Sequence, residues 1–149
     1  MTKVINSKAD FQSYLKDFNS QNVPLYCQWY SEDVSMVIPT VSVEVSGRDP
    51  LKGFFGEARK TMNEYLYPDH VVLDDKGISI YATIYFVPKQ DTEKANGFPA
   101  VKFGQAIRSE YIVFYIFNEL RQIQKFWAVA SGAPVVVDVP KDIRYPPIT

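Results

Sequence analysis

The segment that most restricts the fold is residues 68–87, which read as two β-strands folded back on each other. Asp74 opens a turn, and Gly77 can take the positive φ that such a turn needs. From residue 78 to 86, aliphatic side chains alternate with Ser, Thr and Tyr, the period of two typical of a strand. The second face carries Tyr and Thr instead of charge, so we expect it to be covered as well. The segment also holds the only histidine, His70.

Composition limits the class of protein. The chain has 149 residues, which suits one domain, and its 46% hydrophobic and 15% aromatic content can fill a core. A net charge of −1, without a Lys/Arg cluster, argues against nucleic acid or an anionic membrane as a partner. The single Cys27 forms no internal disulfide and favours a reducing compartment. Without a signal peptide or an apolar run of about 20 residues, we expect a soluble, cytoplasmic protein.

Three segments before the hairpin have helical character. Residues 7–21 place apolar side chains at helical spacing, and Ser7 with Asp10 resembles a capping box. A short helix follows at Pro24. The pair Asp49-Pro50 predicts an N-cap and first turn for a long helix whose apolar period continues to Leu66.

The other segments predict strands and loops. Residues 33–46 carry strand patterns that Pro39 kinks or divides. Residues 102–117 and 120–130 form a second hairpin, and residues 89–100 form a polar loop that can flank a functional opening. Helices followed by hairpins predict an α+β domain with helices on one face of a curved, antiparallel or mixed sheet.

The C-terminal tail is set apart by composition. Four of the ten prolines, Pro134, Pro140, Pro146 and Pro147, lie in residues 133–149 and exclude a helix. We therefore expect one domain over residues 1–132 and a proline-rich tail over 133–149, packed on that domain or on a partner. Residues 135–137 either add an edge strand or lie across a partner.

Several local motifs occur in a recognisable order. Phe18-Asn19-Ser20 ends the first helix, residues 24–34 run from a short helix into a strand, and residues 47–55 start the long helix. A histidine precedes the first hairpin strand, and a Tyr-x-Phe strand is followed by a turn and Gln122-Ile123. Over about residues 10–131 this order resembles the nuclear transport factor 2-like cone fold, within it the SnoaL-like group.

The resemblance implies a cone whose curved sheet wraps the helices and leaves a pocket at its wide end. Members include scytalone dehydratase, ketosteroid isomerase, limonene epoxide hydrolase and aklanonic-ester cyclases, and other members are non-catalytic. Homodimers through the outer sheet face are common in such cones. A dimer would explain why Tyr81, Thr83 and Tyr85 stand where a solvent-facing strand carries Lys and Glu.

His70 is the first candidate catalytic residue. By resemblance it falls near the pocket histidine of scytalone dehydratase, and an imidazole can transfer protons near neutral pH. The alternative is a half-buried strand histidine with local hydrogen bonds. The dehydratase pattern is incomplete here, because a second pocket histidine is missing and its Tyr-Asp pair aligns with Phe18-Asn19. Its pocket serine and asparagine align with Ser109 and Tyr111.

Other residues can complete a site. Tyr30 or Tyr111 can polarise a carbonyl oxygen. Arg108 shares a strand face with Glu110 and either orients a ligand or forms a surface pair. Asp17, Asp33 and Glu44 read as caps or solvated charges. The aromatic residues line a cavity or simply form the core; together with Tyr30 and Tyr111 they are Tyr14, Phe18, Trp29, Phe54, Phe55 and Tyr65.

The remaining residues have plainer interpretations. Arg59 and Lys60 are expected to face solvent, and Cys27 to be a small buried hydrophobe. No zinc spacing, P-loop or dinucleotide motif is present, so neither a metal nor a cofactor is expected.

Two functions follow from these residues. One is a cyclase, dehydratase or isomerase that uses cofactor-free acid–base chemistry on an apolar, oxygenated, polyketide- or terpenoid-like ligand. His70 would be its acid/base group, with Tyr30, Ser109 and Tyr111 orienting the carbonyl. The other is a non-catalytic cone that binds a hydrophobic ligand or serves as a dimeric assembly module.

Overall fold

The computed structural model describes residues 2–95 and 97–143. Its helices are α1 (Lys8–Asn19), α2 (Val23–Tyr26) and α3 (Arg48–Thr61), with the 3-10 turns η1 (Cys27–Trp29) and η2 (Pro39–Val41). Its strands are β1 (Tyr30–Ile38), β2 (Val43–Ser46), β3 (Met62–Leu73), β4 (Gly77–Pro88), β5 (Gln105–Phe117), β6 (Ile123–Ala130) and β7 (Val135–Asp138).

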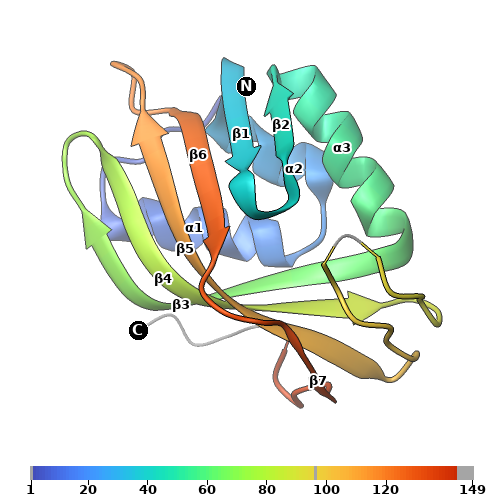
Figure 1. Cartoon of the computed structure of the whole chain (residues 1–149). Helices are drawn as coiled ribbons and strands as arrows, with labels where there is room; N and C mark the ends of the chain where they lie inside the picture. The colour runs from blue at the N-terminus through green and yellow to red at the C-terminus, as the bar shows by residue number, and fades with distance from the viewer. Residues whose placement is uncertain (1, 96, 144–149) are drawn as a thin grey trace.

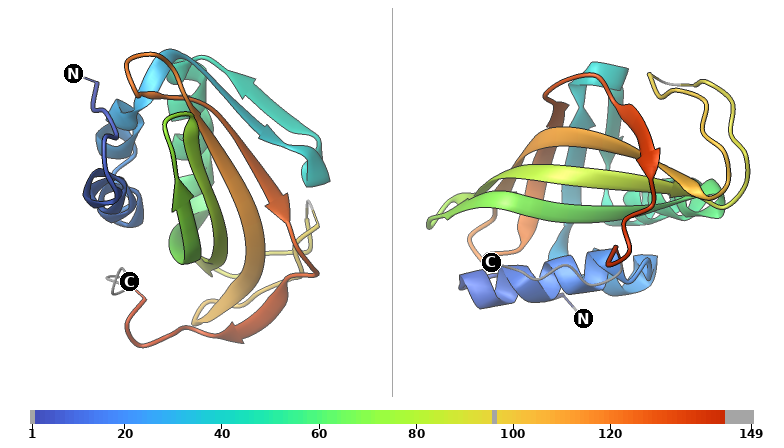
Figure 2. Two further views of the ribbon diagram at one scale, coloured as in Figure 1. Left: turned by 90° about the vertical axis from the view of Figure 1, so that its left-hand side faces the viewer. Right: turned by 90° about the horizontal axis from the view of Figure 1, so that it is seen from below.

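One curved sheet runs through the molecule in the order β2-β1-β6-β5-β4-β3 (Figure 1). The pair β1–β6 is parallel and the other neighbours are antiparallel, so the sheet is mixed. The helix α1 lies along β3 at one end of the sheet (Figure 2). The α+β architecture, with helices packed on a bent sheet, is confirmed.

The helix starts follow local chemistry. Ser7 caps α1 by accepting a hydrogen bond from the Asp10 backbone at 3.2 Å, while the Asp10 carboxylate accepts one from Asn6 N at 2.8 Å. The N-cap of α3 is Gly47, at φ 96°, and not Asp49, which lies in the first turn. There the acid still faces the positive end of the helix dipole.

The prediction that the long helix reaches residue 66 is wrong. Met62, Tyr65 and Leu66 belong to β3, which pairs with β4 over its whole length from Met62↔Pro88 to Leu73↔Ile78. The apolar residues at these positions fit both the helical and the strand spacing, and hydrogen bonding to β4 makes the segment a strand. The Asp74–Gly77 turn is confirmed, as is the division of β1 from β2 at Pro39.

Side-chain amides protect the edge strand β3. Asn19 at the end of α1 donates to Leu66 O at 3.0 Å and accepts from Leu66 N at 2.7 Å. Gln21, at φ 66°, donates to Glu64 O at 2.8 Å and accepts from Glu64 N at 3.0 Å. Each amide therefore pairs like a neighbouring strand residue and satisfies backbone groups that an edge leaves open.

The core is largely aromatic. Tyr14 and Tyr30 are both almost fully buried, and their hydroxyl oxygens lie 2.8 Å apart. Tyr115 and Phe126 close the cluster from β5 and β6. The aromatic residues were predicted either to line a cavity or to form the core, and most of them form the core. The buried cluster contains Tyr14, Phe18, Trp29, Tyr30, Phe55 and Tyr111, and Phe54 packs against it.

Of the segments outside the main strands, one joins the sheet and one folds back on itself. Residues 135–138 form β7, which pairs with the start of β5, so the edge-strand alternative is the observed one. The loop 89–104 folds back on itself through the bridges Thr92↔Val101 and Ala95↔Phe98. Asn96 and residues 144–149, including Pro146 and Pro147, lie outside the described residues.

Candidate functional site

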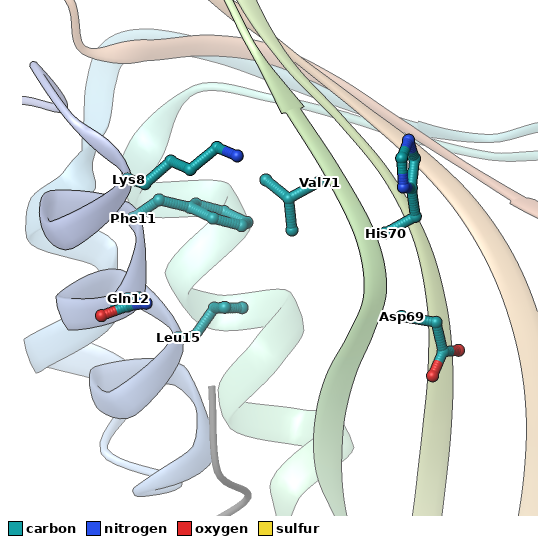
Figure 3. A pocket seen from close by; sticks show the side chains of 7 residues that line it. All are labelled: Lys8, Phe11, Gln12, Leu15, Asp69, His70 and Val71. Carbon is teal, nitrogen blue, oxygen red and sulfur yellow. The ribbon is translucent and has the colours of Figure 1, made fainter. Parts of the chain in front are cut away.

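His70 lies beside an open groove between α1 and β3. The groove has a volume of about 320 Å³ and is bordered by Lys8, Phe11, Gln12, Leu15, Asp69, His70 and Val71. Figure 3 shows Phe11, Leu15 and Val71 pointing toward one another, while the His70 ring points to the other side of β3. His70 is exposed, so its ring does not face the enclosed pocket that the sequence analysis expected.

A β-bulge explains where His70 points. Leu66 and Pro68 pair with Ile84 and Ala82, whose side chains face the helices. The register then shifts between Pro68 and His70, so that His70 pairs with Tyr81 on the outer face and Val71 takes the inner position. One extra residue in a strand reverses the facing of all that follow.

The outer face also holds two residues that the sequence predicted for the site, Arg108 and Tyr65. Arg108 and Glu110 form an ion pair at 3.1 Å, and the Tyr81 hydroxyl donates to Glu110 at 2.6 Å. Both charged side chains are about two-fifths exposed, so the surface-pair alternative is the observed one. Tyr65 is opposite Tyr85 on this face.

The inner face carries an ion pair that the sequence analysis missed. The Arg59 guanidinium on α3 donates from Nη2 to the Glu64 carboxylate on β3 at 2.9 Å. Arg59 is 8% exposed, so the expectation that it faces solvent is wrong. Its Cζ lies 5.5 Å from the Phe18 ring, 6.0 Å from Tyr26 and 5.6 Å from Phe55. Cation–π attraction is strongest where water is excluded, as here.

Polar atoms without partners accompany this pair. Within the described residues, the Tyr26 hydroxyl, Arg59 Nε and Ser109 Oγ are buried and make no hydrogen bond. The Tyr26 hydroxyl lies near the guanidinium, and Ser109 lies near the Tyr111 hydroxyl, in both cases without hydrogen-bond geometry. We call Tyr26, Arg59, Glu64, Ser109 and Tyr111 the interior polar cluster.

Burial sets the electrostatics of the cluster. Loss of hydration raises the pKa of Tyr26 well above its usual value, although the Arg59 charge opposes this. Burial likewise raises the pKa of Tyr111, and the Glu64 carboxylate adds to the rise. Burial lowers the pKa of Arg59, but Glu64, Tyr26 and Tyr30 together outweigh this and the net change is upward. At neutral pH the phenols are therefore hydrogen-bond donors, and Arg59 is a cation.

Sheet register brings the cluster together. Glu64, Leu66 and Pro68 share the inner face of β3, and through β4 the last two reach Ser109 and Tyr111 on β5. Ser109 and Tyr111 therefore lie on the inner face, whereas Tyr30 is occupied by its bond to Tyr14. The cluster combines a carboxylate that can take a proton with several donors that can hold an oxygen.

Neither a metal-binding cluster nor a membrane-spanning helix occurs in the part of the chain that the structure describes. Residues 2–95 and 97–143 contain no group of three His, Cys, Asp or Glu side chains placed to bind a metal ion. Among the same residues, no helix combines the length and apolar character needed to cross a membrane.

The sequence contains a signal that could have pointed to the Arg59–Glu64 pair. Arg59 and Glu64 are five residues apart, and Phe55 is four residues before Arg59 on α3. An arginine one turn after a buried aromatic on the apolar stripe points inward. The apolar spacing of residues 62–66 also fits a helix, and a helix there would not place Glu64 on the inner sheet face.

Comparison with known proteins gives matches only among solved structures. No protein-family model matches the chain, and no curated protein matches it. A candidate polyketide cyclase from Xanthomonas campestris is 18% identical, with a TM-score of 0.67 over 82% of this chain and 87% of its own. A candidate polyketide cyclase from Pseudomonas putida is 18% identical, with a TM-score of 0.65 over 79% of this chain and 86% of its own.

A third similar structure is SalBIII, an epoxide hydrolase/cyclase-like enzyme with a role in forming a pyran ring of the polyether salinomycin. It is 10% identical, with a TM-score of 0.68 over 89% of this chain and 95% of its own. Further matches include a protein with a ketosteroid isomerase-like fold and a SnoaL-like protein of unknown function. At these identities the likeness shows the fold alone: the chain has the nuclear transport factor 2-like, ketosteroid isomerase-like cone fold that its sequence predicted.

Proposed function

We propose that the protein is a small-molecule enzyme that performs cofactor-free acid–base chemistry on an apolar, oxygen-bearing substrate at the interior polar cluster. The observation that carries the proposal is Glu64, a carboxylate on the inner sheet face held 2.9 Å from Arg59 among aromatic rings. Similar structures whose names refer to cyclases support the same class of chemistry. This makes the protein a cyclase, dehydratase or isomerase.

The chemistry begins with proton abstraction. A Glu64 oxygen takes a proton from the carbon next to a substrate carbonyl, and the electrons of that C–H bond form the enolate. The Tyr26 and Ser109 hydroxyls and Arg59 Nε–H are the unused donors for the enolate oxygen. Return of the proton to a different carbon gives isomerisation, attack of the enolate on a second carbonyl gives cyclisation, and loss of a β-hydroxyl as water gives dehydration.

The proposed base is Glu64 and not His70, the base that the sequence predicted. His70 is exposed on the outer face and separated from the cluster by the sheet, so it does not reach a substrate held there. Tyr30 is left out because its hydroxyl is bonded to Tyr14 in the filled core. Ser109 keeps the orienting role that the sequence predicted for it, and Tyr111 lies beside it.

Proton exchange tests the proposal without knowledge of the natural substrate. The enolisable ketone 2-acetylnaphthalene is incubated with the protein in D₂O, and loss of its methyl signal is followed by NMR. The protein should speed exchange over buffer, and Glu64→Gln should remove about a hundredfold of that acceleration or more. Glu44→Gln, which changes an exposed carboxylate on β2, is the matched control. Equal rates for the wild type and Glu64→Gln would refute the proposal.

A dimeric module is the second candidate function, because part of the outer sheet face is apolar. Two cross-strand rows cover it: His70, Tyr81, Ile112 and Val129, then Val72, Ser79, Phe114 and Trp127. Val72 is 51% exposed and Phe114 43%. Contiguous apolar surface of this kind marks an interface, and we propose a second copy of the chain as the partner. The buried free thiol of Cys27 suits the cytoplasm, where we propose that the protein acts.

A further inference from the structure

The open groove between α1 and β3 is a feature that the proposed function does not use. It is bordered by none of the residues of the interior polar cluster. Phe11 and Leu15 from α1 point toward Val71 of β3 across it (Figure 3). Lys8 borders the groove in the first turn of α1, whereas Asn19, at the other end of this helix, holds β3 through its amide. The groove therefore runs along α1 from the Asn19 end to the Lys8 end.

The backbone of β3 faces this groove at Val71. Side-chain amides already pair with the edge-facing backbone groups of Glu64 and Leu66. Residues two apart in a strand direct these groups to the same side, and the register shift after Pro68 makes Val71 the next residue to face the edge beyond the bulge. No loop of the described residues hydrogen-bonds to the Val71 backbone. An occupant of the groove therefore has to offer apolar surface and a backbone partner together.

Ile143 brings the chain to one end of the groove. Ile143 is 7% exposed, and its carbonyl oxygen accepts a hydrogen bond from the Tyr67 hydroxyl on β3. Tyr67 directly follows Leu66, which the Asn19 amide holds, so this anchor lies at the Asn19 end. Residues 144–149, which are outside the described residues, follow directly on the anchor.

The length of this segment matches the groove. From Asn19 to Lys8, α1 rises by about 16 Å. Six residues in the extended conformation that consecutive prolines favour span about 19 Å. Residues 144–149 can therefore reach from the anchor to the Lys8 end without any change in the sheet.

The composition of the segment matches it as well. Four of its six residues can cover the apolar side chains of the groove: Tyr145, Pro146, Pro147 and Ile148. A polyproline segment makes no internal hydrogen bonds, so its carbonyl groups are free to accept from the Val71 N–H. Arg144 comes first, which places it near the Asp69 carboxylate at the anchor end and away from Lys8.

From the anchor, the length and the composition we propose that residues 144–149 of the same chain dock in the groove between α1 and β3 and close it. The proposal goes beyond the proposed function and does not depend on it, because the groove and the interior polar cluster share no residue.

Nuclear Overhauser contacts test the occupant directly in the full chain. Protons of Tyr145 and Ile148 should show contacts to the methyl groups of Leu15 and Val71. In a mixture of isotope-labelled and unlabelled chains, these contacts should arise within one chain. Their absence from the folded protein, or contacts between two different copies, would overturn the proposal.

Hydrogen exchange measures the closure. Ending the chain after Ile143 should speed exchange of the Val71 amide about tenfold or more, because the groove side of β3 loses its cover. Ile148→Ser in the full chain should have an effect of about tenfold, since a buried isoleucine side chain is lost from the contact. Phe103→Ser is the matched control, because Phe103 is an apolar side chain 70% exposed in the loop 89–104. It should leave exchange at Val71 unchanged. Equal exchange at Val71 in the full and the shortened chain would overturn the proposal.

Discussion

Replacing Ser109 by alanine is expected to stabilise the protein, against the usual effect of mutating a buried residue. Ser109 is 2% exposed, and its hydroxyl has no hydrogen-bond partner within the described residues. Burying such a hydroxyl is unfavourable by about 1–3 kcal/mol, whereas the methyl group that replaces it has no polar atom to satisfy. After allowance for the lost contacts of the oxygen, Ser109→Ala should raise the free energy of unfolding by about 1 kcal/mol.

Ser31→Ala is the matched control. Ser31 is 3% exposed, but its hydroxyl donates to the Asp33 carboxylate at 2.7 Å. Removing this hydroxyl should lower the free energy of unfolding, because the hydrogen bond to Asp33 is lost and nothing is gained in its place. Urea unfolding resolves the two signs as midpoint shifts in opposite directions. Destabilisation by Ser109→Ala equal to that of Ser31→Ala would refute the view that the cluster leaves donors free for a ligand.

Three further results are expected. Asn19→Ala removes both hydrogen bonds to Leu66 and should destabilise the fold by about 2–4 kcal/mol in urea unfolding; a loss below about 0.5 kcal/mol would contradict the edge-strand role. Phe114→Glu should convert a dimer to monomer in analytical ultracentrifugation, while Leu120→Glu, at a side chain 68% exposed, should not; a monomeric wild type would refute the dimer. Burial raises the pKa of the Cys27 thiol to about 11, so the stability linked to it holds below about pH 8.5 and is lost as the pH rises toward 11. Thiol labelling should be slow at pH 8 unless urea is added, and rapid labelling of the folded protein would contradict this.

Local signals predicted much of the fold. Asp74 and Gly77 located the hairpin turn, and Pro39 located the break between β1 and β2. The boundary between α3 and β3 could not be found in the same way, because the apolar positions of residues 62–66 suit either period. Pairing with β4 and the amides of Asn19 and Gln21 decide it, and both depend on residues distant in the chain.

The site was harder to predict than the fold. His70 was correctly placed on the first hairpin strand, but the register shift after Pro68 turned its side chain outward, and no residue type marks a bulge there. Arg59 looked like an ordinary surface charge, since the rings that enclose it come from α1 and α2 as well as its own helix. Whether a side chain faces the core or the solvent depends on strand register and packing, which a periodic sequence pattern does not contain.

The most direct measurement compares the two candidate bases in one assay. Exchange of the 2-acetylnaphthalene methyl protons in D₂O is followed for the wild type, Glu64→Gln and His70→Ala under the same conditions. Glu64→Gln should lose about a hundredfold of the acceleration, and His70→Ala should keep nearly all of it. Loss of exchange in His70→Ala with full exchange in Glu64→Gln would show that the chemistry lies on the outer face and not among the interior aromatic rings.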